Sequence, residues 1–274
     1  MAALPTLLPP RTLMPSCFGD RGHPRSIGRT YDDLISDALR APIQGWDFSW
    51  LTGRMDRDDL PWDYQALARD AVTKATRLLD IDTGGGELLA RLAPLPAAIA
   101  TESYAPNVPI ATARLVPLGV DVRAGRASAL PVADGDVNLV LNRHGSIDAT
   151  ETVRVLTPQG VLLTQQVGSA NDLAFNDALG APPPSPPDAH TLHSTVAELE
   201  HVGLVIDQAQ EDYPVTRYFD VGAVVFQLRS VPWQVPGFDV RSSEERLRHL
   251  DAHIRRTGSF DVKNHRFLVR AHRG

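Results

Sequence analysis

The sequence contains very little cysteine and no long apolar run. Cys17 is the single cysteine among 274 residues, which excludes an internal disulfide and any zinc site that needs several cysteines. No apolar stretch approaches the roughly 20 residues that span a bilayer. Pro5, Pro9 and Pro10 interrupt the N-terminal stretch, so we expect no continuous signal core there. These absences predict a cytoplasmic protein without a membrane-spanning segment.

Lysine is also scarce, and positive charge is concentrated near the C-terminus. Lys74 and Lys263 are the only lysines among 27 basic residues. The formal net charge is −6, although residues 241–274 hold nine basic residues against four acidic ones. The rest of the chain is therefore acidic, which argues against a general nucleic-acid binder. A hydrophobic content of 43% is enough for an ordinary globular core without a metal or disulfide staple.

The most informative stretch lies between residues 78 and 92. Its first part, residues 78–81, is a short, mainly apolar run that suits a strand buried on both faces. Three consecutive glycines, Gly84–Gly86, then let the backbone turn sharply and come close to a ligand. Leucines at helical spacing follow, and a helix N-terminus offers unpaired N–H groups to an anionic group. Strand, glycine turn and helix together predict a cradle for a nucleotide-type ligand.

Two common glycine motifs do not fit this stretch. A phosphate-binding P-loop needs Gly-Lys-Ser/Thr, whereas glutamate follows Gly86. A dinucleotide fingerprint needs a small residue where this chain has Leu89. The series Asp80-x-x-x-Gly84-x-Gly86 resembles instead the first motif of class I S-adenosylmethionine-dependent methyltransferases, usually Asp/Glu-x-Gly-x-Gly-x-Gly. The sequence departs from that motif at its first glycine, which is replaced by Asp82.

Later stretches carry the same resemblance. Glu102 ends a second predicted strand, 22 residues after the first aspartate of the motif, near the spacing at which an acidic residue binds a ribose. Residues 130–141 are similar to the family's turn and fourth strand, and Pro158 lies in a similar turn before the fifth strand. Where the family often has Gly-Asp near the adenine, this chain has Gly125-Arg126. Arg126 could stack on the base but cannot accept a hydrogen bond from its amine.

The resemblance and the alternation of predicted strands and helices imply an α/β fold. We expect a doubly wound, Rossmann-like sheet of seven strands, mostly parallel with an antiparallel C-terminal strand, and a helical cap. Residues 219–229 fit either a strand or a helix, and the resemblance favours a helix. The expected divisions are a flexible extension at 1–28, a cap helix and aromatic segment at 29–59, and a methyltransferase domain at 60–272 with residues 214–257 as a cap insertion.

The resemblance implies S-adenosylmethionine as the cofactor. The residues that it implies for cofactor binding surround the glycine turn and the ends of the neighbouring strands: Asp80, Asp82, Thr83, Gly84, Gly85, Gly86, Glu102, Arg126 and Asn142. No metal site is expected. His249 and His253 have the spacing of metal ligands on a helix, but both project opposite to its apolar positions and should face water.

The acceptor side of the site is predicted from residues near the expected methyl group. His144 follows the fourth strand and is the candidate general base, although a structural histidine in a turn is an equal alternative. Asp47, in the aromatic segment, is a weaker catalytic candidate. The predicted substrate-binding residues are Trp46, Trp50, Arg143 and Trp233, whose aromatic rings favour a partly apolar acceptor.

The sequence therefore predicts methyl transfer from S-adenosylmethionine to an O, N or C atom of a small, partly apolar molecule. The relevant resemblance is to the small-molecule, type 11-like methyltransferases. We expect a monomer or homodimer without a nucleic-acid or membrane partner. Two alternatives stay open: an RNA base methyltransferase, and a non-catalytic binding protein with a degenerate cofactor site.

Overall fold

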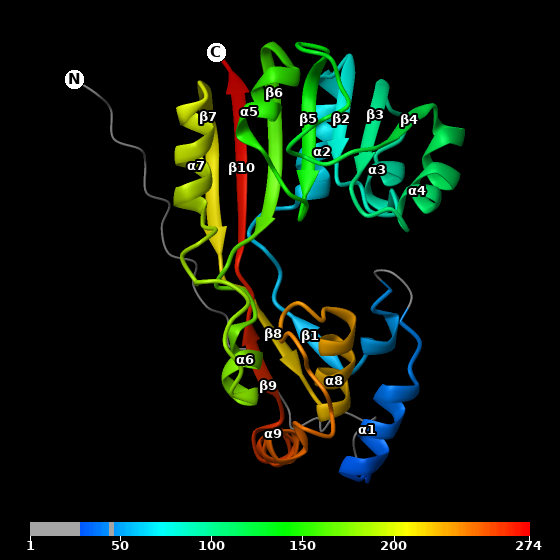
Figure 1. The fold of residues 1–274 in the computed structure, drawn as a ribbon, viewed down its shortest axis with the longest axis vertical. Helices are drawn as coiled ribbons and strands as arrows, with labels where there is room; N and C mark the ends of the chain where they lie inside the picture. Colours follow the sequence, from blue (N-terminus) through cyan, green and yellow to red (C-terminus); the bar gives the residue numbers. More distant parts are fainter. Residues whose placement is uncertain (1–27, 44–46) are drawn as a thin grey trace, which may run out of the picture.

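In the computed structural model, which describes residues 28–43 and 47–274, a seven-stranded sheet forms the larger of two lobes (Figure 1). Its strand order is β4-β3-β2-β5-β6-β10-β7. Neighbouring strands are parallel except at β10, which is antiparallel to both β6 and β7. The predicted sheet is therefore confirmed, including its antiparallel C-terminal strand. The strands are β2 (Arg77–Ile81), β3 (Ala97–Glu102), β4 (Val120–Ala124), β5 (Val137–Arg143), β6 (Leu156–Val167), β7 (Leu204–Asp212) and β10 (Arg266–Arg273).

Helices cover both faces of this sheet, which explains why its central strands carry apolar side chains on both faces. Leu78 and Leu79 are adjacent in β2, and side chains alternate between the two faces of a strand. Leu78 packs in a core cluster with α2, α3 and α4, whereas Leu79 packs in another cluster with α5 and α7. The helices are α2 (Tyr64–Lys74), α3 (Glu87–Arg91), α4 (Val108–Leu115), the 3-10 turn η2 (Val116–Leu118), α5 (Ala149–Val155) and α7 (Leu192–His201).

The smaller lobe combines segments that are far apart in the sequence. A three-stranded antiparallel sheet of order β1-β8-β9 is packed with four helices and a 3-10 turn. No helix in the described part of the chain is both long and apolar enough to cross a bilayer. The elements are α1 (Tyr31–Arg40), η1 (Ser49–Leu51), β1 (Met55–Arg57), α6 (Leu173–Leu179), β8 (Val215–Tyr218), α8 (Val221–Ser230), α9 (Glu244–Thr257) and β9 (Phe260–Lys263).

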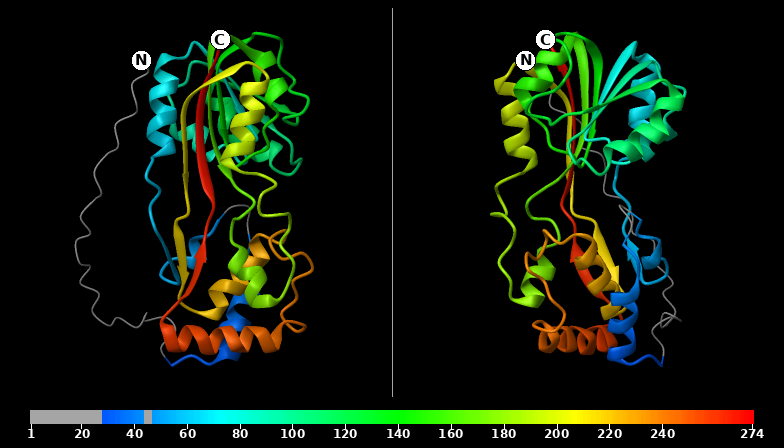
Figure 2. Two further views of the ribbon diagram at one scale, coloured as in Figure 1. Left: turned by 90° about the vertical axis from the view of Figure 1, so that its left-hand side faces the viewer. Right: turned by 45° about the vertical axis from the view of Figure 1, so that its right-hand side comes forward.

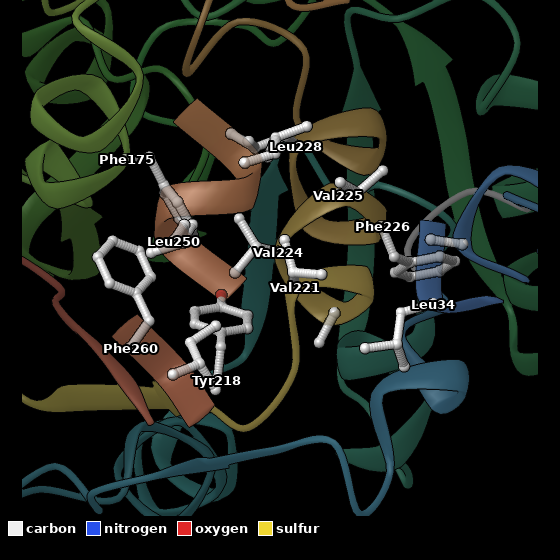
Figure 3. Packing of buried hydrophobic residues seen from close by; sticks show 14 of the residues in the cluster. Leu34, Phe175, Tyr218, Val221, Val224, Val225, Phe226, Leu228, Leu250 and Phe260 are labelled. Carbon is white, nitrogen blue, oxygen red and sulfur yellow. The ribbon is translucent and has the colours of Figure 1, made fainter. Parts of the chain in front are cut away.

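Helix α8 is the centre of the smaller lobe. Its residues 221–228 are all buried, as expected for a helix that is apolar on all sides. Figure 3 shows Val224 on the side of Phe175 and Leu250, and Phe226 on the side of Leu34. The Asp220 side chain caps the helix by accepting from the Ala223 N–H (2.8 Å). The predicted helix over residues 219–229 is thus confirmed, with bounds shifted by one or two residues.

The two lobes are joined by one long antiparallel strand pair. Strand β7 continues into β8, and β9 continues into β10, so the same two stretches pair in both sheets (Figures 1 and 2). The ladder is interrupted near Pro214, which has no N–H to donate, although its carbonyl oxygen accepts from the Asn264 N–H (2.8 Å). The carboxyl ends of the parallel strands face the smaller lobe (Figure 1).

Candidate functional site

The glycine turn lies between β2 and α3 and has an alternating backbone conformation. Asp82, Gly84 and Gly86 have φ values of 53°, 64° and 79°, a left-handed region that favours glycine and tolerates aspartate better than most residues. The turn is closed by the Gly86 N–H, which donates to the Thr83 carbonyl oxygen (3.0 Å). The Thr83 N–H donates to the Thr101 carbonyl oxygen (2.9 Å) and ties the turn to β3. Asp82 thus adopts a left-handed conformation, of the kind that glycine takes readily.

The three glycines of the turn meet different constraints. A Cβ on Gly86 would lie 2.7 Å from Leu115 Cγ, so Gly86 allows α3 to approach α4 closely. A Cβ on Gly85 would lie 2.9 Å from Arg114 Nη1, and that guanidinium donates to the Gly85 carbonyl oxygen. A Cβ on Gly84 would meet nothing within 4 Å. Gly86 therefore serves packing, the atoms nearest a Cβ on Gly85 are the ends of flexible side chains, and Gly84 borders open space.

Glu102 connects the turn to a pocket at the carboxyl ends of β3 and β4. Its Oε2 accepts from the Gly84 N–H (2.6 Å), and its Oε1 accepts from the Tyr104 N–H (2.7 Å). Burial raises the pKa of the Glu102 carboxyl, while these two amide hydrogen bonds act in the opposite direction. The pocket has a volume of about 460 Å³ and is lined by Glu102, Ser103, Ala105, Val108, Pro109, Ala124, Gly125 and Arg126.

Asp82 directs its side chain toward the loop after β5. Its Oδ2 accepts from the Ser146 N–H (2.9 Å), whereas its buried Oδ1 has no hydrogen-bond partner among the described residues. Burial raises the pKa of the nearby Asp80 carboxyl to about 7, and the carboxylates of Asp82 and Glu102 act in the same direction. Three carboxyl groups thus converge on the turn, which makes this part of the site suited to a cation.

Asn142 braces the same region from β5 and is fully buried. Its Nδ2 donates to the Ile81 and Ser146 carbonyl oxygens (3.2 and 3.0 Å). Its Oδ1 accepts from Thr164 Oγ1 (3.0 Å) and from Gln166 Nε2. An amide side chain has two donors and two acceptor sites, so none is left for a ligand. We therefore expect Asn142 to support the site through the loops that it holds.

His144 lies just beyond β5 in a left-handed conformation, with a φ of 62°. Its Nε2 lies 2.7 Å from Gln165 Nε2, and Gln165 Oε1 accepts from Trp62 Nε1 (2.7 Å). Because the indole nitrogen can only donate, the amide of Gln165 must present its N–H to His144. The Nε2 of neutral His144 is therefore the acceptor, and its Nδ1 carries the proton.

The surroundings of His144 keep the imidazole neutral. Part of the side chain is open to solvent, yet the enclosing protein lowers its pKa well below the ordinary value. The guanidinium groups of Arg266, Arg143 and Arg57 act in the same direction. A neutral ring that already accepts at Nε2 and carries its proton on Nδ1 is a weak proton acceptor. This geometry favours a hydrogen-bond donor over the general base that the sequence predicts.

Known structures share the fold described above. The likeness to BH2331 from Bacillus halodurans C-125, provisionally assigned as a methyltransferase, covers 77% of this chain and 98% of that one, with 17% identity and a TM-score of 0.57. The YcgJ protein from Bacillus subtilis is 18% identical over 77% of this chain and 97% of its own, with a TM-score of 0.56. The chain has a class I methyltransferase fold. No family model and no curated protein matches the sequence.

Within the class I methyltransferase fold, the predicted substrate-binding residues are spread over several places. Arg143 is the last residue of β5, next to His144. Trp50 belongs to the smaller lobe, where its ring stacks on Phe226 (4.8 Å between centroids) and lies under the Arg54 guanidinium. Trp233 is 55% exposed. Trp46 lies outside the described residues, as does nearly all of the predicted extension at 1–28.

The second catalytic candidate, Asp47, lies near the start of the smaller lobe's 3-10 turn η1. Asp47 is exposed and accepts from the Ser49 N–H (2.8 Å), which lowers the pKa of its carboxyl. Among the residues that the structure describes, no three His, Cys, Asp or Glu side chains gather in a way that could hold a metal ion. Sequence reasoning missed Trp62 and Gln165, which orient His144. Neither residue belongs to a motif, because they meet only after β6 and the segment before α2 come together.

Proposed function

We propose that this protein is an S-adenosylmethionine-dependent methyltransferase that acts on a small molecule. The observation that carries the proposal is the contact between Glu102 and the Gly84 N–H at the mouth of the 460 Å³ pocket. It sets a carboxylate beside a left-handed glycine turn at the carboxyl edge of a doubly wound sheet, which is where such sheets bind nucleotides.

The residues at this edge fit the cofactor. The Glu102 carboxylate has acceptor capacity for ribose hydroxyls, and Ala105, Val108 and Pro109 give the pocket an apolar wall for a base. The orphaned, buried Asp82 Oδ1 is complementary to an ammonium group. The negative charge of Asp82 would attract that ammonium group. Arg126 lines the same pocket and is free to stack on a base.

The chain contributes mainly alignment and exclusion of water. S-adenosylmethionine, when bound, supplies an electrophilic methyl group on a sulfonium. A displacement of this kind needs an in-line acceptor and a dry site more than it needs proton transfer. Because His144 is held by Gln165 and Trp62, its Nδ1–H would donate to the acceptor and fix its orientation. The smaller lobe faces the strand ends and would cover the acceptor (Figure 1).

Isothermal titration with S-adenosylmethionine tests the proposal. We expect the wild-type protein to bind, and Glu102→Ala to bind about 10- to 100-fold more weakly because charge-assisted hydrogen bonds are lost. Glu200→Ala removes an exposed carboxylate from α7 and is the matched control. Equal affinity in the two variants would place the cofactor elsewhere. No binding by the wild type at about 1 mM ligand would favour the non-catalytic alternative with a degenerate site.

The RNA alternative is tested separately by filter binding. A protein that neutralises several phosphates loses affinity steeply as salt rises. We expect no such salt-dependent binding of single-stranded or structured RNA, because the chain is acidic outside residues 241–274. Tight binding with a steep salt slope would instead support an RNA substrate.

A further inference from the structure

Three arginines from both lobes converge on His144. Arg143 ends β5 and Arg266 begins β10, and both pair with β6, at Gln165 and Val167 respectively. Arg57 ends β1 in the smaller lobe, and its Nε donates to Thr216 Oγ1 (3.0 Å). All three guanidinium groups act on His144, and each acts electrostatically on at least one of the others. The strand register therefore brings three cations to the edge that the acceptor must approach.

None of these three arginines has a carboxylate at ion-pair distance among residues 28–43 and 47–274. The Arg143 guanidinium makes no hydrogen bond to that part of the chain, and the Arg57 guanidinium donates to a hydroxyl. Arg266 donates to Asn171 Oδ1 and to the His265 carbonyl oxygen (2.9 Å). Elsewhere in the protein, arginines such as Arg217 and Arg154 are paired with carboxylates. Several guanidinium N–H groups beside His144 are therefore available to a ligand.

The cluster is electrostatically unfavourable without an anion. Enclosure by protein, together with the charges of Arg57 and Arg143, lowers the pKa of Arg266 to about 10. Asp172 acts in the opposite direction, but burial raises the pKa of its own carboxyl, and Asn264 Nδ2 occupies its Oδ1. One carboxyl group does not balance three guanidinium groups. Like charges held together in this way point to a negatively charged ligand.

We propose that Arg57, Arg143 and Arg266, with the Nδ1–H of His144, bind a negatively charged oxyanion group of the methyl acceptor. Guanidinium groups match the geometry of carboxylate and phosphate oxygens and bind both by paired hydrogen bonds. The inference rests on the proposed function, because it names the acceptor class of the same site. It makes the substrate a small anion, held between the two lobes by residues of each.

The test measures anion binding directly, in the full-length protein. Inorganic phosphate and succinate are titrated calorimetrically, at an ionic strength kept constant with potassium chloride. The variants are Arg143→Gln from the larger lobe and Arg57→Gln from the smaller lobe, so that a defect in one variant does not decide the result. Arg241→Gln, an exposed arginine outside the cluster, is the control. S-adenosylmethionine is titrated into the same four proteins.

We expect the wild type and Arg241→Gln to bind at least one anion, and both cluster variants to bind it about tenfold more weakly. A stronger response to phosphate or to succinate identifies which oxyanion the acceptor carries. The proposal is overturned if the wild type binds neither anion, or if the cluster variants match Arg241→Gln. Anion binding without S-adenosylmethionine binding would contradict the proposed function but support the anion site. S-adenosylmethionine binding without anion binding would contradict only the anion site.

Discussion

The two halves of the candidate site have opposite charge and different origins. The half around the glycine turn is acidic, with the Asp80, Asp82 and Glu102 carboxyl groups close enough to perturb one another. The half around His144 is basic, with three guanidinium groups that lack carboxylate partners in the described chain. A sulfonium cofactor with an ammonium group suits the acidic half, and an anionic acceptor suits the basic half. The contrast would orient the two ligands before any chemistry takes place.

The halves also differ in what holds them. Backbone conformation and short-range contacts shape the acidic half, because Asp82, Gly84 and Gly86 lie within five residues. Side chains from β1, β5, β6 and β10 shape the basic half. A substitution that disturbs the backbone of the acidic half should therefore change stability as well as binding. A substitution in the basic half should mainly change binding. The predictions below run from the largest expected effect to the smallest.

The largest effect should come from Asp80. Its folded pKa of about 7 lies above the unfolded value of about 4, so the folded state binds more protons in between. The free energy of unfolding should therefore fall as pH rises from about 4 to about 7, by up to about 4 kcal/mol. Asp80→Asn should remove this fall. Urea unfolding of both proteins across that pH range measures this dependence. If the free energy of unfolding changes equally with pH in wild type and in Asp80→Asn, the electrostatic explanation is wrong.

Gly86 tests the steric side of the acidic half. Gly86→Ala should lower the free energy of unfolding by about 3 kcal/mol, from the left-handed backbone and the clash with Leu115. Gly135 also has a positive φ, of 58°, but a Cβ there meets nothing within 4 Å. Gly135→Ala should therefore cost only about 1 kcal/mol. If urea unfolding shows that both variants lose the same free energy of unfolding, the clash with Leu115 does not contribute.

His144 tests the basic half through kinetics. Asn tolerates a positive φ and can place an N–H near the position of Nδ1. His144→Asn should therefore keep kcat/KM within about tenfold of wild type, whereas His144→Ala should lose about 100-fold. The wild-type rate should not depend on a group that titrates near pH 6.5, because the imidazole pKa lies well below that value. Equal, severe losses of kcat/KM in both variants would instead support His144 as a general base.

Asp82 should give the smallest effect. Asp82→Asn keeps an oxygen that can accept from the Ser146 N–H but removes the charge. If Oδ1 binds the ammonium group, affinity for S-adenosylmethionine should fall by about tenfold in calorimetric titration. Tighter binding by the variant would mean that the carboxylate repels the ligand. The free energy of unfolding should stay close to that of wild type.

The sequence predicted the sheet, the glycine turn and the position of Glu102 more fully than the acceptor side. The buried strand, the glycines and Glu102 follow one another in 25 residues, and local backbone chemistry sets their conformation. Helix α8 needed more than local pattern, because its apolar residues fit a strand as well. Burial on all sides by the smaller lobe selects the helix, since its backbone groups are then satisfied internally.

Contacts between segments that are far apart in the sequence bring the residues of the basic half together. Arg57 meets Thr216 across 159 positions, and Trp62 meets Gln165 across 103. No motif links such residues, so the sequence offered only Arg143 and His144, which lie together at the end of one strand. It also assigned Trp50 to the substrate, whereas the structure shows its ring stacked on Phe226 in the smaller lobe.

The sequence by itself determined the doubly wound sheet and the left-handed turn beside Glu102, because strand burial, glycine freedom and short spacings act over neighbouring residues. Only the tertiary structure decided the direction of the Asp82 carboxylate, the tautomer of His144 and the gathering of three arginines. Those features depend on which strands pair and how the two lobes meet, and residues far apart in a chain come together only when it folds.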